Sequence, residues 1–150
     1  MTIHVAVAGA SGYVGGELLR LISAHPMLDL GAVTGHSNVG HRLSEFQPHI
    51  PEFADRVIVD TSPENLAEHE VVFLALPHTK SAEIAEALPA HTMIIDCGAD
   101  FRLQDAGAWE TYYQSTHAGS WPYGMPELTL ASGGKLRTEL REVRRLAIPG

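Results

Sequence analysis

The most constraining feature of the sequence is a glycine-rich stretch that joins a strand pattern to a helix pattern. Alternating apolar residues predict a short buried strand at Ile3, Val5 and Val7. Apolar residues at helical spacing follow at Val14, Leu18, Leu21 and Ile22. Between them lies Gly9-Ala10-Ser11-Gly12-Tyr13-Val14-Gly15. A strand that turns through glycines into a helix is the context of a dinucleotide-binding loop, and the first βα turn of a doubly wound sheet is its usual place.

Each glycine of this loop has a distinct expected role. Gly9 suits a backbone angle that side chains resist. Gly12 would let the backbone approach a pyrophosphate, and Gly15 would let the helix lie close to the strand. The helix N-terminus would offer unpaired N–H groups to phosphate. The spacing is G-x-x-G-x-x-G rather than G-x-G-x-x-G, and a purely structural turn is the alternative interpretation.

The rest of the chain alternates between strand and helix patterns. Apolar runs predict further strands at 28–33, 56–60, 71–76, 92–97 and from 146 onward. Helices are predicted from 14 to about 24, after Ser62, and at 81–88, 103–113 and 135–143, with a long loop at 41–55. This alternation predicts an α/β fold, a Rossmann-like, doubly wound, mostly parallel sheet with helices on both faces.

The residues after the second predicted strand favour NADP over NAD. An NAD site usually has a carboxylate there for the ribose 2′-hydroxyl. Asp29 has the right distance along the chain, but it opens the strand and would lie at the wrong edge of the sheet. The correct edge carries the neutral donors His36, Ser37 and Asn38, with Arg42 further on. The alternative is that these are ordinary polar residues of a loop.

Composition narrows the class of partner. Ten basic and eighteen acidic residues give a formal charge of −8, which argues against a nucleic-acid partner. No apolar run approaches the ~20 residues that span a bilayer, and no signal peptide is visible. A single cysteine excludes an internal disulfide and agrees with a reducing compartment. We therefore expect a cytoplasmic protein with a small-molecule substrate, in which residues 1–150 form one domain.

Several other residues are candidates for chemistry. Nine histidines show no metal-binding spacing, so no metal site is expected. Cys97 ends an apolar strand pattern and is expected to be a small buried hydrophobe with a raised pKa rather than a nucleophile. Asp96, Asp100 and Arg102 suggest a salt-bridged loop. His78, at the tip of the strand 71–76, either faces the cofactor or caps the next helix.

Four segments, in this order and spacing, resemble the N-acetyl-gamma-glutamyl-phosphate reductase family, and its actinobacterial members in particular: Gly9–Leu18, Phe73–His78, Ile95–Arg102 and Pro122–Glu127. The resemblance implies an enzyme of arginine biosynthesis that reduces N-acetyl-glutamyl 5-phosphate to the semialdehyde with NADPH. A cysteine thiolate would form a thioester, which hydride then reduces. The resemblance also implies a homo-oligomeric enzyme.

The resemblance further implies roles for individual residues. Gly9, Ser11, Gly12, Tyr13, Val14 and Gly15 would bind the cofactor diphosphate, Ser37 and Asn38 its 2′-phosphate, and Pro77 and His78 would border the nicotinamide. Residues 123–127 would lie near the active-site cleft. The family nucleophile lies in a Pro-Gly-Cys motif, whose first two residues match Pro149 and Gly150. We therefore expect residues 1–150 to be an NADP-binding Rossmann domain with no catalytic residue of its own, followed by a substrate and dimerisation domain that supplies an acid/base histidine.

The sequence leaves two alternative classes of protein open and argues against a third. Another semialdehyde dehydrogenase of the same superfamily would share most of these segments, and a non-catalytic dinucleotide-binding module would share the glycine loop. A short- or extended-chain reductase needs a Tyr-x-x-x-Lys pair. None of the tyrosines has a lysine four residues later, which argues against that class.

Overall fold

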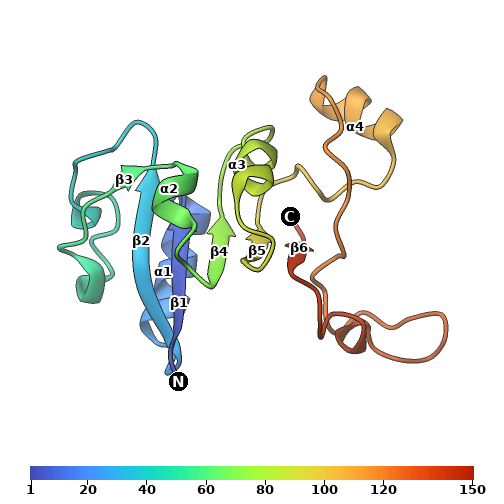
Figure 1. Cartoon of the computed structure of the whole chain (residues 1–150), viewed down its shortest axis with the longest axis horizontal. Coiled ribbons are helices and arrows are strands. Elements are labelled where there is room, and N and C mark those ends of the chain that lie inside the picture. Colours follow the sequence, from blue (N-terminus) through green and yellow to red (C-terminus); the bar gives the residue numbers. More distant parts are fainter.

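The computed structural model describes all 150 residues and contains one six-stranded parallel sheet. The strand order is β3-β2-β1-β4-β5-β6, which runs from left to right in Figure 1. The strands are β1 Ile3–Ala8, β2 Leu28–Gly35, β3 Val59–Asp60, β4 Val71–Leu74, β5 Met93–Asp96 and β6 Arg145–Ala147. This is the 3-2-1-4-5-6 order of a doubly wound dinucleotide-binding sheet, so the predicted fold class is confirmed.

Helices and single 3-10 turns occupy the connections between the strands. The α-helices are α1 Tyr13–Ser23, α2 Pro63–Leu66, α3 Ser81–Ala87 and α4 Ala106–Tyr113. The 3-10 turns are η1 Leu43–Glu45, η2 Pro51–Phe53 and η3 Leu136–Thr138. None of the helices is both long and apolar enough to cross a membrane.

Both faces of the sheet are covered. On one face Val5 and Val7 of β1 pack with Leu19 and Ile22 of α1. Ala6 and Ala8 point to the other face, where the core includes buried residues of α2 and α3. Successive side chains of a strand point to opposite faces, so β1 contributes to both cores and is buried throughout its second half.

All strands run the same way, so their carboxyl ends share one edge of the sheet. The glycine loop, the turn after β2 and the tip of β4 all lie at this edge. Asp29 lies at the opposite edge, where it pairs with His4 at the start of β1, with 3.1 Å between Nδ1 and Oδ2. The sequence-based rejection of Asp29 as a ribose ligand is therefore confirmed.

The predicted helix at 135–143 is wrong. Only the short turn η3 forms there, and the N–H groups of Leu136 and Arg137 donate to the carbonyls of Leu128 and Pro126. This segment runs out beyond β6, on the right of Figure 1. A short helix needs an apolar surface to pack against, and Leu136, Leu140 and Val143 all stay partly exposed.

Two other elements begin three residues later than predicted. Only Val59–Asp60 of the predicted strand 56–60 joins the sheet, because Ile58 and Arg56 form backbone hydrogen bonds with residues 40–43. The helix predicted from residue 103 begins at Ala106, where Asp105 caps it by accepting from the Ala108 N–H at 2.6 Å.

Candidate functional site

The loop between β1 and α1 is held in one conformation by close backbone contacts. Gly9 has φ +84°, and a side chain there would overlap the carbonyl of Ala75. A β-carbon at Gly15 would overlap Gly9 O and lie 2.8 Å from the Ala10 α-carbon. At Gly12, by contrast, a β-carbon would meet only Gly9 O, at 3.5 Å. Gly9 and Gly15 are therefore required by the fold, whereas Gly12 faces open space.

The open side of this loop presents unpaired backbone donors. The N–H groups of Ser11, Tyr13, Val14 and Gly15 form no hydrogen bond within the chain. Gly12, Tyr13 and Val14 are exposed at the same place. Unpaired N–H groups at the start of a helix form a binding site for an anion such as phosphate.

The turn after β2 contacts the glycine loop directly. The Asn38 side chain donates from Nδ2 to Ser11 Oγ at 3.0 Å, while His36 and Ser37 are exposed. No carboxylate follows β2, but the sheet brings Asp60 of β3 alongside Gly35, which the sequence did not reveal. Its Oδ1 accepts from the Asn65 side chain at 2.9 Å. Arg42 lies further along and pairs with Asp55, 2.6 Å from Nη1 to Oδ1.

The tip of β4 lies next to the same loop. Ala75 N–H donates to Ala8 O at 2.8 Å, which continues the pairing with β1 one residue past β4. The exposed Pro77 and His78 follow this residue along the chain. His78 forms no hydrogen bond, so nothing supports the capping alternative. Its ring packs instead on Tyr113 of α4, with 5.4 Å between the ring centroids.

A buried aspartate fixes the turn after this tip. Asp100 is almost fully buried, and its two carboxylate oxygens accept from the N–H groups of Thr79, at 2.6 Å, and Ala82, at 3.0 Å. Thr79 has φ +71°, a left-handed conformation that costs energy for a residue with a side chain. Asp100 therefore stabilises the strained turn that carries His78.

The predicted salt bridge among Asp96, Asp100 and Arg102 is wrong. The Arg102 guanidinium donates to two carbonyls, Ile148 O at 3.1 Å and Gly98 O at 2.7 Å. Asp96 accepts from the Gly98 N–H at 3.0 Å, and burial raises the pKa of its carboxyl. Arg102, Asp100 and one oxygen of Asp96 thus bond to backbone groups, while Asp96 Oδ2 is buried without a hydrogen-bond partner. A short sequence pattern does not indicate these backbone partners.

Cys97, the single thiol of the chain, directly follows β5. It is half-buried, rather than fully buried as expected. Burial, reinforced by the nearby Asp96 carboxylate, raises the pKa of the Cys97 thiol to about 11. The raised pKa confirms the prediction, and little thiolate exists near neutral pH.

The segment 121–127 lies at the same edge of the sheet, beside β6. Gly124 N–H donates to Ala147 O at 2.7 Å, and the Trp121 ring stacks on Phe101 with 3.6 Å between centroids. Glu127 forms an ion pair with Arg137. These contacts place the segment near Ile148, whose carbonyl accepts from Arg102, and near Gly150, where a side chain would overlap the Arg102 guanidinium.

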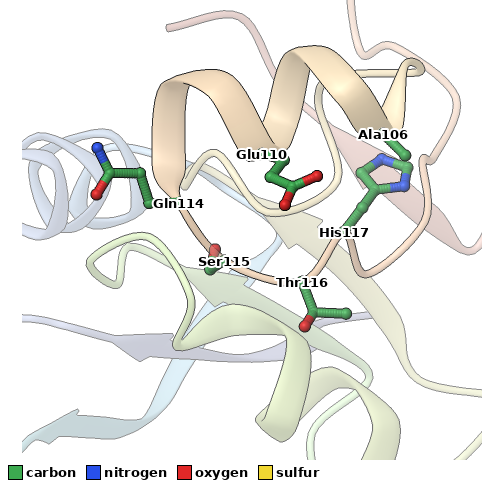
Figure 2. A pocket seen from close by; sticks show the side chains of 6 residues that line it. All are labelled: Ala106, Glu110, Gln114, Ser115, Thr116 and His117. Carbon is green, nitrogen blue, oxygen red and sulfur yellow. The ribbon is translucent and has the colours of Figure 1, made fainter.

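A separate hollow lies at the end of α4, away from the glycine loop. It has a volume of about 770 Å³ and is lined by Ala106, Glu110, Gln114, Ser115, Thr116 and His117. Figure 2 shows α4 and the segment after it forming its walls. The hollow contains no residue of the glycine loop or of the β4 tip, and one of its lining residues is hydrophobic. Ligand sites are mostly apolar with a few polar groups, so its lining is unlike that of a nucleotide site.

Comparison with known proteins agrees with this geometry. Residues 4–132 match the family model described as semialdehyde dehydrogenase, NAD binding domain. Over all 150 residues the chain is 59% identical to N-acetyl-gamma-glutamyl-phosphate reductase of Renibacterium salmoninarum and 58% identical to that of Thermobifida fusca. The chain spans 43% and 42% of the length of these two relatives.

Solved structures show the same fold. Aspartate semialdehyde dehydrogenase with NADP from Candida albicans has a TM-score of 0.62 at 24% identity, over 71% of this chain and 32% of that one. Aspartate semialdehyde dehydrogenase II from Vibrio cholerae has a TM-score of 0.56 at 16% identity, over 100% of this chain and 42% of that one. With a family model that matches most of its length, the chain belongs to the semialdehyde dehydrogenase NAD-binding domain family.

Proposed function

We propose that residues 1–150 are the NADPH-binding domain of an enzyme that reduces N-acetyl-glutamyl 5-phosphate to N-acetyl-glutamate 5-semialdehyde. Relatives between 53% and 59% identical over the whole chain carry the name N-acetyl-gamma-glutamyl-phosphate reductase. The observation that carries the proposal is the row of unpaired N–H groups at Ser11, Tyr13, Val14 and Gly15. They suit the diphosphate of a dinucleotide, and the space at Gly12 leaves room for its approach.

In this proposal the chain holds and orients the cofactor, which supplies the hydride when bound. Gly9, Ser11, Gly12, Tyr13, Val14 and Gly15 form the diphosphate site. Ser37 and Asn38 contact the 2′-phosphate, and the hydrogen bond from Asn38 to Ser11 links these two parts of the site. Pro77 and His78 border the nicotinamide, on a turn that Asp100 holds.

The preference for NADPH rests on charge at the end of β2. Neutral donors follow this strand, so a 2′-phosphate meets no carboxylate there. Asp60 lies one strand away, with one carboxylate oxygen taken up by Asn65. Since a 2′-phosphate needs donors and a ribose hydroxyl needs an acceptor, this arrangement favours the phosphorylated cofactor.

We place the nucleophile outside residues 1–150, directly after Gly150. The raised pKa of Cys97 argues against that residue. The Arg102 guanidinium donates to Ile148 O and fills the space that a side chain at Gly150 would need, so it would fix the backbone that leads to the nucleophile. The acid/base histidine and the substrate-binding residues would come from a second domain, and the whole enzyme would be a cytoplasmic homo-oligomer.

A substrate comparison with the full-length enzyme tests this proposal. In the reverse direction, NADP reduction should require inorganic phosphate and N-acetyl-glutamate 5-semialdehyde. Aspartate 4-semialdehyde is the matched control, because it shares the aldehyde but lacks the acetyl group and one methylene. Phosphate-dependent turnover of the control alone would show that the enzyme is another semialdehyde dehydrogenase, and turnover of neither would refute the proposed activity.

A further inference from the structure

A buried side-chain amide, Gln47, bridges two carbonyls of the glycine loop. Its Nε2 donates to Ala10 O at 3.0 Å and to Gly12 O at 2.9 Å. The residue is only 5% exposed, although it lies in an irregular connection between β2 and β3. Amides are seldom buried unless their hydrogen bonds are satisfied, so both donor hydrogens have a structural use here.

The surrounding chain is shaped to deliver this amide. Leu43 and Ile50, on either side of Gln47, are buried in the core cluster that contains α1, and they fix the connection against the helix. A β-carbon at Gly16 would overlap Gln47 Oε1. The glycine at position 16 therefore makes room for the amide, a role separate from those of Gly9, Gly12 and Gly15.

The two hydrogen bonds fix the direction of the 10–11 peptide plane and support that of the 12–13 plane, whose carbonyl also accepts from the Gly16 N–H at 2.9 Å. No peptide bond in the chain is cis, and in a trans peptide the carbonyl and the N–H of one plane point in opposite directions. Ala10 O shares its plane with Ser11 N–H, and Gly12 O shares its plane with Tyr13 N–H. Because both carbonyls point to Gln47, both N–H groups point away from it, and neither has a partner in the chain.

We infer that Gln47 is a positioning residue that aims the Ser11 and Tyr13 N–H groups at the cofactor diphosphate. This inference rests on the proposed cofactor-binding function. Without the amide, each of the two peptide planes loses a hydrogen bond. Ala10 O then has no partner in the chain, whereas Gly12 O keeps the hydrogen bond from the Gly16 N–H at 2.9 Å. Binding an anion would then require the loosened 10–11 plane to be ordered again. The effect should be confined to ligands that contain the diphosphate.

Ligands that differ in one part test this role in the 150-residue chain. The variant is Gln47→Met, which keeps the length of the side chain but lacks the donor. Gln104→Met is the matched control, since Gln104 is exposed and forms no hydrogen bond. Calorimetric titration should show that Gln47→Met weakens NADPH and 2′-phospho-ADP-ribose about tenfold, and adenosine 2′-phosphate, which lacks the diphosphate, by less than about twofold.

The outcomes separate this inference from the proposed function. Equal loss for all three ligands, or no loss for any, would overturn the role of Gln47 while leaving cofactor binding intact. Failure of the unchanged chain to bind any of the three would refute the proposed function itself.

Gln47→Glu gives a second route if the methionine variant does not fold. An ionised glutamate cannot donate to a carbonyl, whereas a protonated one can donate once. Binding of NADP⁺ should therefore recover as the pH falls through the pKa of that carboxyl, relative to the unchanged chain at each pH. A constant ratio between the two chains across the pH range would contradict the inference.

Discussion

Replacing Gly12 with valine should abolish cofactor binding and leave the fold intact. Gly12 has φ −85° and ψ 176°, an extended conformation that β-branched residues adopt readily. Its β-carbon would have one neighbour, Gly9 O, at 3.5 Å. The added side chain would instead occupy the exposed space in front of the unpaired N–H groups.

The expected magnitudes follow from this geometry. Loss of glycine reduces the freedom of the unfolded chain and stabilises the fold by about 0.4–1 kcal/mol. Valine is a poorer helix N-cap than glycine by a similar amount, so the free energy of unfolding should change by less than about 1 kcal/mol. Two lost hydrogen bonds to a charged diphosphate contribute about 3 kcal/mol or more, which weakens the NADPH Kd more than about hundredfold.

Gly15→Ala is the matched variant in the same loop, with the opposite expectation. Its β-carbon would overlap the rigid backbone of Gly9 and Ala10. Overpacking of this kind costs about 1–3 kcal/mol, and the backbone contact places Gly15→Ala at the upper end. The better helix propensity of alanine offsets about 1 kcal/mol, which leaves a net loss of about 2 kcal/mol.

Urea denaturation and calorimetric titration with NADPH measure both effects on both variants. We expect Gly12→Val to keep its denaturation midpoint and lose binding, and Gly15→Ala to lower its midpoint. Parental NADPH affinity in a folded Gly12→Val chain would refute the diphosphate site and favour the interpretation of the loop as a structural turn.

Three further predictions concern the other parts of the site. Ser37→Asp should weaken NADPH about tenfold by repulsion of the 2′-phosphate and leave NADH unchanged; equal affinities of the unchanged chain for the two cofactors, by calorimetry, would contradict the assignment. Asp100→Ala should lower the free energy of unfolding by about 3 kcal/mol, because two buried N–H groups lose their acceptor, whereas Asp105→Ala, at an exposed helix cap, should cost about 1 kcal/mol in urea denaturation. Because the pKa of Cys97 is raised to about 11, labelling of Cys97 by a thiol reagent should be slow at pH 8 and become faster as the pH rises toward about 11. Cys97→Ser should leave full-length activity intact. Rapid labelling at pH 8 with loss of activity would make Cys97 the nucleophile.

The sheet was predictable because each strand carries its own apolar pattern. Val71–Leu74 is entirely apolar and Met93–Asp96 is apolar in its first three residues, as expected for parallel strands covered on both faces. The exclusion of Asp29 followed from strand direction alone. The type of the glycine loop was predictable, because the close backbone contacts at positions 9 and 15 require glycine, and these glycines are visible in the sequence.

The remaining features depend on contacts between distant residues. Gln47 lies 35 positions from Gly12, and nothing in its sequence neighbourhood distinguishes it from a polar loop residue. Asp100 was predicted to form a salt bridge with Arg102. In the folded chain its carboxylate instead accepts hydrogen bonds from the backbone N–H groups of Thr79 and Ala82. The helix predicted at 135–143 failed for the related reason that its apolar residues found no surface to pack on.

The most direct test of the central claim is a ¹H–¹⁵N correlation spectrum of the chain titrated with NADPH. We expect the amide signals of Ser11, Tyr13, Val14 and Gly15 to shift most, with those of Ser37 and Asn38 following, because unpaired N–H groups gain a phosphate acceptor. NADH should shift the loop signals and leave Ser37 nearly unchanged. Shifts confined to the hollow beside α4, at Glu110, Gln114 and His117, with an unaffected glycine loop, would contradict the account.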